Sequence, residues 1–192
     1  MRTTQLRIAG VHAAALRSHL FPGDGKEAVA FALCGRHRAV AQDVLVVRDV
    51  VPVAYADCPV REEGLVTWRT QAIEPLLIRA GKEKLGVVKF HSHPTGFPRF
   101  SATDDVSDAD LFPSVYGWVD DDGPHASVVM LPNGQFFGRS IDVENRFSAL
   151  ERICVVGHDV SIFWIPPLDP HRLTLSGMNS FLAPRPRTCF ER

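Results

Sequence analysis

The chain has 192 residues, of which 45% are hydrophobic and 22% charged, a composition typical of a folded globular protein and not of a disordered or fibrous one. The 21 basic and 22 acidic residues leave a formal net charge of -1, so no charge excess points to nucleic acid or to an anionic membrane as a partner. No apolar run approaches the roughly 20 residues of a membrane span, and charged residues interrupt the N-terminal stretch where a signal peptide would lie, so we expect a cytoplasmic protein.

The first third of the chain predicts three strands and one helix. Residues 4–8 alternate weakly, as in a strand, and residues 11–20 follow helical spacing until a proline and a glycine stop it. Glu27 then precedes residues 28–35, a short run of small apolar residues that suits a strand buried on both faces. The valine-rich residues 40–53 predict the next strand, which we expect to pair with 28–35 through a turn at residues 35–38.

The middle of the chain predicts a strand between two helices. Residues 54–70 give no clear periodic signal, so we expect an irregular excursion there. Helical spacing over 72–80 is followed by an apolar strand over 85–90. A further helix is expected from 101 to 111, where Pro113 should halt it because proline disfavours helix in the residue before it.

The last part of the chain predicts short strands and then a tail. The expected strands lie at 114–119, 125–131 and 135–140, and the Pro-Asn-Gly between the last two is a strong hairpin signal. Residues 147–165 fit either a short helix and a strand or two strands. Residues 166–192 contain five prolines and few apolar clusters, so we expect one domain over residues 1–165 followed by an extended or mobile tail.

Two histidines at the end of the 85–90 strand are candidate metal ligands. Side chains two positions apart on a strand share a face, so His91 and His93 can direct both imidazoles at one point, and Pro94 ends the strand there. Ser101 has the form of a helix N-cap, with Asp104 about one turn into the helix. Two imidazoles and one carboxylate, with a fourth position left to water, are the ligand set of a hydrolytic zinc site.

A hydrolytic zinc site also needs a proton acceptor, and Glu27 is the candidate. It stands directly before an apolar strand, where burial near the metal could hold it ready to carry a proton. Spacing alone leaves Asp24, Glu62 and Glu63 as rivals and leaves open that Glu27 is only a charge at a strand edge. An N-cap role alone would likewise explain Ser101.

The string His91-Ser-His93-Pro94, then six residues, then Ser101-Ala-Thr-Asp104, with Glu27 upstream, resembles the complete signature of the JAMM family, also called JAB or MPN-plus. This resemblance implies a cytidine-deaminase-like α/β fold, a mixed β-sheet flanked by helices. It also implies that His91, His93 and Asp104 bind one zinc ion, that Glu27 is general base and acid toward the zinc-bound water, and that Ser101 stabilises the tetrahedral oxyanion. Three other aspartates in the N-terminal half of this helix are expected to be solvated or favoured by the helix dipole, namely Asp105, Asp108 and Asp110.

The resemblance implies a zinc-dependent isopeptidase or peptidase of bacterial type, similar to deubiquitinases. Its substrate would be the bond after the C-terminus of a ubiquitin-like protein, cleaved to mature a precursor or to release a conjugate. Partners would be that modifier or its conjugate and operon-encoded activating and conjugating enzymes. Neither nucleic acid nor a membrane is expected as a partner.

Three alternatives remain open from the sequence. A RadC-like, DNA-repair-associated branch carries a similar motif, and residues 91–96 with Pro98 resemble its glycine-and-proline loop. Against it stand the near-neutral charge and the lack of an N-terminal helical DNA-binding module. A peptidase that processes a sulfur-carrier protein is the second alternative. The third is a non-catalytic MPN scaffold, although such scaffolds normally lack one or more of the motif residues that this chain retains.

Overall fold

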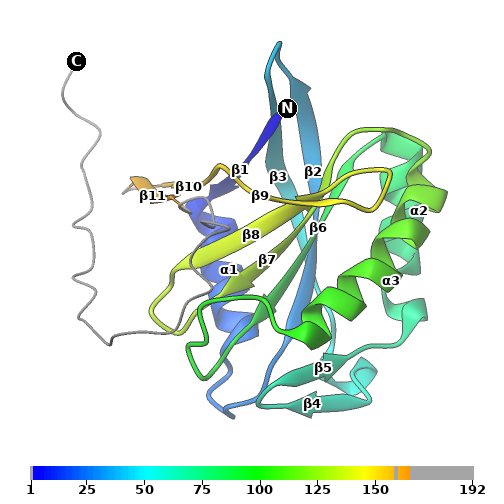
Figure 1. Ribbon diagram of the computed structural model, residues 1–192. Helices are drawn as coiled ribbons and strands as arrows, with labels where there is room; N and C mark the ends of the chain where they lie inside the picture. The colour runs from blue at the N-terminus through cyan, green and yellow to red at the C-terminus, as the bar shows by residue number, and fades with distance from the viewer. Residues whose placement is uncertain (1, 158–159, 165–192) are drawn as a thin grey trace, which may run out of the picture.

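One mixed β-sheet forms the centre of the computed structural model, which describes residues 2–157 and 160–164 (Figure 1). Its nine strands in the described residues are β1 (Thr3–Ala9), β2 (Val29–Arg38), β3 (Gln42–Pro52), β6 (Gly86–Ser92), β7 (His125–Met130), β8 (Phe136–Ile141), β9 (Phe147–Ala149), β10 (Arg152–Val156) and β11 (Val160–Trp164). They lie in the order β11-β10-β1-β3-β2-β6-β7-β8-β9. The pairs β1–β10, β1–β3 and β6–β7 are parallel, and the other pairs are antiparallel. The expected mixed sheet with helices on it is therefore confirmed.

The helices cover both faces of this sheet. Figure 1 shows α1 (Gly10–Leu20) on one face, and α2 (Glu74–Glu83) with α3 (Ala102–Val119) on the other. Each face has its own apolar core, one with the buried side chains of α1 and the other with those of α2 and α3. Successive residues of β2 alternate between these two cores, so β2 is buried on both faces as its apolar run predicts. The expected turn at residues 35–38 was wrong, because these residues continue β2 and pair with β3, and the connection lies at residues 39–41.

The stretch expected to be irregular contains a small hairpin. Strands β4 (Val60–Glu62) and β5 (Leu65–Thr67) pair antiparallel as a separate two-stranded sheet. Single turns of 3-10 helix flank the hairpin at Tyr55–Asp57 and Thr70–Ala72. Strands of three residues are too short to show an alternating pattern, so this hairpin could not be predicted from the sequence.

The helix expected to stop at Pro113 continues to Val119, so the predictions of its end and of a strand over 114–119 were wrong. Proline lacks the N–H that would bond the carbonyl of Ala109 four residues earlier. In the fold, the side-chain amide of Asn145 donates to that carbonyl at 3.1 Å. A distant residue thus satisfies the carbonyl that proline leaves free, and the buried side chains of Phe112 and Val115 hold the helix against α2 and the sheet.

The C-terminal predictions are settled in part. The described residues between 147 and 164 form three short strands, β9, β10 and β11. Neither expectation for this segment holds in full, because these residues contain no helix and there are three strands where two were expected. The proposed tail over 166–192 lies outside the described residues. No helix in the described part of the chain is long and apolar enough to span a membrane.

Candidate metal centre

Strand β6 presents the two histidines at its C-terminal end. Its position between β2 and β7 fixes the backbone there: His91 lies opposite Val29 on one side and Val129 on the other. The next residue, Ser92, faces away and accepts a hydrogen bond from the Ala28 N–H at 3.0 Å. The backbone N–H of His93 donates to the carbonyl of Met130 at 3.1 Å, so the chain is still held one residue beyond the strand.

The first turn of α3 supplies the carboxylate. Ser101 is the N-cap, and its hydroxyl oxygen accepts the N–H of Asp104 at 3.1 Å. In return, the Oδ2 atom of Asp104 accepts from the backbone N–H and the hydroxyl of Ser101 at 2.7 and 2.8 Å. This capping box fixes the Asp104 carboxylate at the helix start, with Oδ1 left free of helix contacts.

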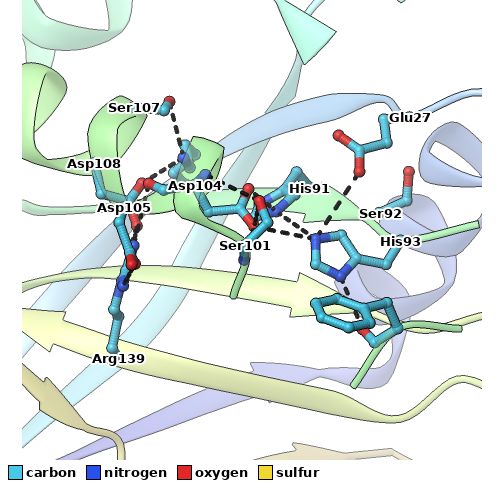
Figure 2. A network of polar contacts seen from close by, with 12 residues as sticks. Glu27, His91, Ser92, His93, Ser101, Asp104, Asp105, Ser107, Asp108 and Arg139 are labelled. Carbon is cyan, nitrogen blue, oxygen red and sulfur yellow. Dashed lines mark hydrogen bonds and ion pairs between the residues drawn. The ribbon is translucent and has the colours of Figure 1, made fainter. Parts of the chain in front are cut away.

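The ligand atoms of His91, His93 and Asp104 converge on one point (Figure 2). The Nε2 atoms of His91 and His93 lie 3.1 Å apart. Oδ1 of Asp104 lies 2.9 Å from Nε2 of His91, and Oδ2 lies 3.3 Å from Nε2 of His93. Around a tetrahedral zinc ion with bonds of about 2.0–2.1 Å, ligand atoms lie roughly 3.3 Å apart. The three residues therefore fit one zinc ion, and all three are buried.

A backbone contact sets the orientation of the His93 ring. Its Nδ1 atom lies 2.8 Å from the carbonyl oxygen of Phe97, which can only accept, so Nδ1 carries the proton. The Nε2 lone pair then faces His91 and Asp104. A carbonyl that holds the far nitrogen of a ligand histidine is the usual second contact of metal-binding imidazoles.

Glu27 lies just before β2, beside His93. Its backbone N–H donates to the carbonyl of Glu62 in the β4–β5 hairpin at 2.7 Å, and its carbonyl accepts from the Arg61 side chain at 3.0 Å. The Oε1 atom of Glu27 lies 3.9 Å from Nε2 of His93. The hairpin thus anchors the backbone of Glu27 while the carboxylate faces the cluster, as Figure 2 shows.

Burial and neighbouring charges separate the two carboxyl groups of the site. Burial raises the pKa of Glu27 to about 7, and the charge of Asp104 adds to this, against the opposing effects of His93 and Lys89. Burial also disfavours ionised Asp104, but hydrogen bonds with His91 and His93 outweigh it and hold the pKa of Asp104 well below its usual range. One carboxyl is therefore a permanent anion suited to a cation, and the other can exchange a proton near neutral pH.

A groove of about 240 Å³ opens beside this cluster. Glu63 and Gly64 of the hairpin turn line one part of it, and Thr95 and Phe97 of the loop after β6 line another, while Glu27, His93 and Ser101 also border it. A chain bound in this groove would therefore meet one candidate ligand, His93, together with Ser101 and the candidate proton carrier Glu27.

The five residues singled out from the sequence for the site meet in space, but the roles of Asp108, Lys89 and the Phe97 carbonyl were not foreseen. Asp108, expected to be solvated, is fully buried, so that expectation was wrong. Lys89 is buried two positions before His91, and its ammonium forms an ion pair with Asp108. A charged residue inside an otherwise apolar strand was the available signal, because lysine is rarely buried without a partner. The orienting carbonyl of Phe97 belongs to the backbone and leaves no trace in the sequence.

Comparison with known proteins gives the family. The chain resembles the solution structure of protein DSY2949 from Desulfitobacterium hafniense, with a TM-score of 0.52 and 15% identity over 80% of this chain and 94% of that one. Such low identity supports the shared fold alone. No curated protein matches the sequence. A family model that describes prokaryotic homologues of the JAB domain matches residues 11–138, which include all five site residues. The chain therefore belongs to the JAB-domain family, among its prokaryotic homologues.

Proposed function

We propose that this protein is a zinc-dependent peptidase that hydrolyses the bond after the C-terminus of a ubiquitin-like modifier. The observation that carries the proposal is the convergence of the His91, His93 and Asp104 ligand atoms beside the Glu27 carboxyl, at an open groove. Structural zinc sites are closed by four protein ligands, whereas hydrolytic sites keep a position open. Three ligands with a carboxyl of raised pKa beside them have the composition of the second kind.

The residues of the chain divide the work of hydrolysis. His91, His93 and Asp104 would hold the zinc ion, whose Lewis-acid chemistry makes water acidic enough to attack near neutral pH and polarises the scissile carbonyl. Glu27 accepts the proton of the attacking water and passes it to the amine nitrogen as the carbon–nitrogen bond breaks, which leaves a carboxylate and a free amine. Ser101 can donate to the developing oxyanion once its hydroxyl turns from Asp104, whose Oδ2 keeps the backbone N–H of Ser101.

We infer that the groove takes an extended peptide. It runs between the turn of the β4–β5 hairpin, at Glu63 and Gly64, and the loop at Thr95 and Phe97. The C-terminal tail of a modifier could lie there extended, with the hairpin as one wall and backbone contacts supplying affinity. Operon-encoded activating and conjugating enzymes would then be functional partners of this protein.

The test uses a ubiquitin-like protein encoded near the gene, prepared as a linear fusion and as a lysine conjugate. We expect the zinc-loaded protein to cut after the last residue of the modifier, identified by the mass of both products. Cleavage of the fusion alone would assign precursor maturation, and cleavage of the conjugate would assign deconjugation. If the protein holds zinc and cuts neither the fusion nor the conjugate, the proposed activity is contradicted.

A further inference from the structure

A buried charged cluster lies behind the candidate metal centre. Its members are Lys89 of β6, Asp108 of α3 and Arg139 of β8, which are 3%, 0% and 8% exposed. The Lys89 ammonium pairs with Oδ1 of Asp108, and the Arg139 guanidinium donates to Oδ2 from Nε and Nη2 at 2.9 and 2.7 Å. One carboxylate thus joins a helix to two strands of the sheet that are not neighbours, as Figure 2 shows in part.

This cluster repeats the spacing of the metal ligands. Lys89 and His91 lie two residues apart on the same face of β6, which corresponds to about 6.6 Å along a strand. Asp108 and Asp104 lie four residues apart on α3, which corresponds to about 6 Å along a helix. The Lys89–Asp108 pair and the His91–Asp104 pair, whose atoms lie 2.9 Å apart, are therefore successive contacts between the same two elements.

Arg139 adds a direct contact to the ligand residue. Its Nη2 atom also donates to the backbone carbonyl of Asp104 at 3.1 Å. The guanidinium lies between two aromatic rings, 4.0 Å from the ring centre of Phe100 and 4.2 Å from that of Phe147. Three kinds of contact hold this side chain, so the position of the Asp104 backbone is fixed from the side opposite to its carboxylate.

Shifting α3 along β6 would break these contacts at high cost. A shift by one residue would separate Asp108 from Lys89 and leave buried charges without partners. Asp105, the next residue of α3, points about 100° away around the helix, and its Oδ1 accepts from Nη1 of Arg139 at 2.5 Å, so Arg139 also holds this carboxylate apart from that of Asp104. The buried charges therefore select one helix position.

We propose that Asp108 and Arg139 are positioning residues for the metal centre: they fix the register of α3 against β6 and so place the Asp104 carboxylate opposite His91 and His93. This inference rests on the proposed zinc centre, because positioning matters only if these residues bind a metal. In the described part of the chain, Arg139 reaches the ligand residue through the backbone carbonyl of Asp104 and not through its carboxylate, so a substitution that keeps its positive charge tests the placement of Asp104.

The test compares zinc affinity of the full chain by competition with a chelator, for wild type, Arg139→Lys and Asp108→Asn. Residues that orient metal ligands typically change metal affinity by about 10–100-fold, and we expect losses in that range. Lysine keeps a cation beside Asp108 but cannot form the fork that also reaches Asp104, so Arg139→Lys is expected to fold even if Asp108→Asn does not. The visible spectrum of the Co²⁺-loaded variants, which reports ligand number and geometry, should change as well.

Asp43→Asn is the matched control. Asp43 is also a buried aspartate paired with arginines, Arg2 and Arg38, but it lies opposite Arg38 at the far end of β2 from the Val29–His91 pair. We expect this variant to lose stability and keep the zinc affinity and cobalt spectrum of wild type. An equal loss of affinity in the control would overturn the inference, since metal binding would then only follow stability.

The remaining outcomes separate the two proposals. A folded Arg139→Lys protein with the zinc affinity and cobalt spectrum of wild type would overturn the positioning role and leave the zinc centre intact. A wild-type protein that binds no zinc would instead reject the metal centre itself, and the positioning role with it.

Discussion

Replacing Glu27 by glutamine should remove most of the activity without harming the fold. Glutamine keeps the shape of the side chain but cannot accept a proton from water. General acid–base groups contribute about 10²–10⁴-fold to rate, and Glu27 would act twice in one turnover, so we expect kcat to fall by about 10⁴-fold, roughly 5.5 kcal/mol in the barrier. Because burial raises the pKa of Glu27 to about 7, the ionised group is not favoured by the fold, and Glu27→Gln should leave the free energy of unfolding equal or higher.

The assay measures release of a fluorophore from the C-terminal amide of a ubiquitin-like protein, together with zinc content and thermal unfolding. Glu62→Gln is the matched control, because this residue contacts Glu27 through its backbone carbonyl, which the substitution preserves. We expect the control to keep its activity. A Glu27→Gln protein that holds zinc and retains more than about a tenth of the wild-type kcat would refute the role of Glu27 as proton carrier.

Three further predictions test single contacts. Ser101→Gly should cost only a few tenths of a kcal/mol in stability but lower kcat by about 10²-fold or more; unchanged kcat would leave Ser101 as an N-cap alone. His125 is fully buried, and burial with the nearby Arg36 lowers its pKa, so its contribution to stability is complete above pH of about 6.5 and declines as the pH falls. Below pH 6.5, the free energy of unfolding of His125→Asn, measured with urea, should fall with pH less steeply than that of wild type, by about 1.4 kcal/mol per pH unit. The same slope in both proteins would contradict this account. Asn145 has a φ of 59°, which glycine also adopts, so Asn145→Gly removes the donor to the Ala109 carbonyl without straining the backbone. We expect the free energy of unfolding to fall by about 1 kcal/mol. An unchanged free energy of unfolding would refute our account of how the helix continues past Pro113.

The central strands β2 and β6 and the pair of histidines at the end of β6 could be predicted from the sequence because both depend on local patterns. The alternation and burial of β2 and β6 follow from runs of small and β-branched residues. The candidate ligands His91 and His93 share a face because they are two positions apart in the sequence at the end of one strand. Placing Glu27 in the same site required the family resemblance, because its distance to His93 depends on how β2 pairs with β6.

The errors arose where distant residues changed a local preference. Pro113 should end a helix by its own chemistry, and it does not because Asn145 supplies the missing hydrogen bond. Asp108 belongs by composition to a solvated helix start, yet Lys89 and Arg139 make its burial possible. Neither partner can be identified without the packing of α3 on the sheet.

The central claim is that hydrolysis depends on one zinc ion held by His91, His93 and Asp104. The most direct measurement strips the full chain of metal with a chelator and follows cleavage of the ubiquitin-like amide while zinc is added back. We predict that stripping abolishes cleavage, and that activity returns in proportion to added zinc and levels off at one ion per chain. Cleavage that survives complete removal of metal, or zinc bound at one per chain without any cleavage, would contradict the account.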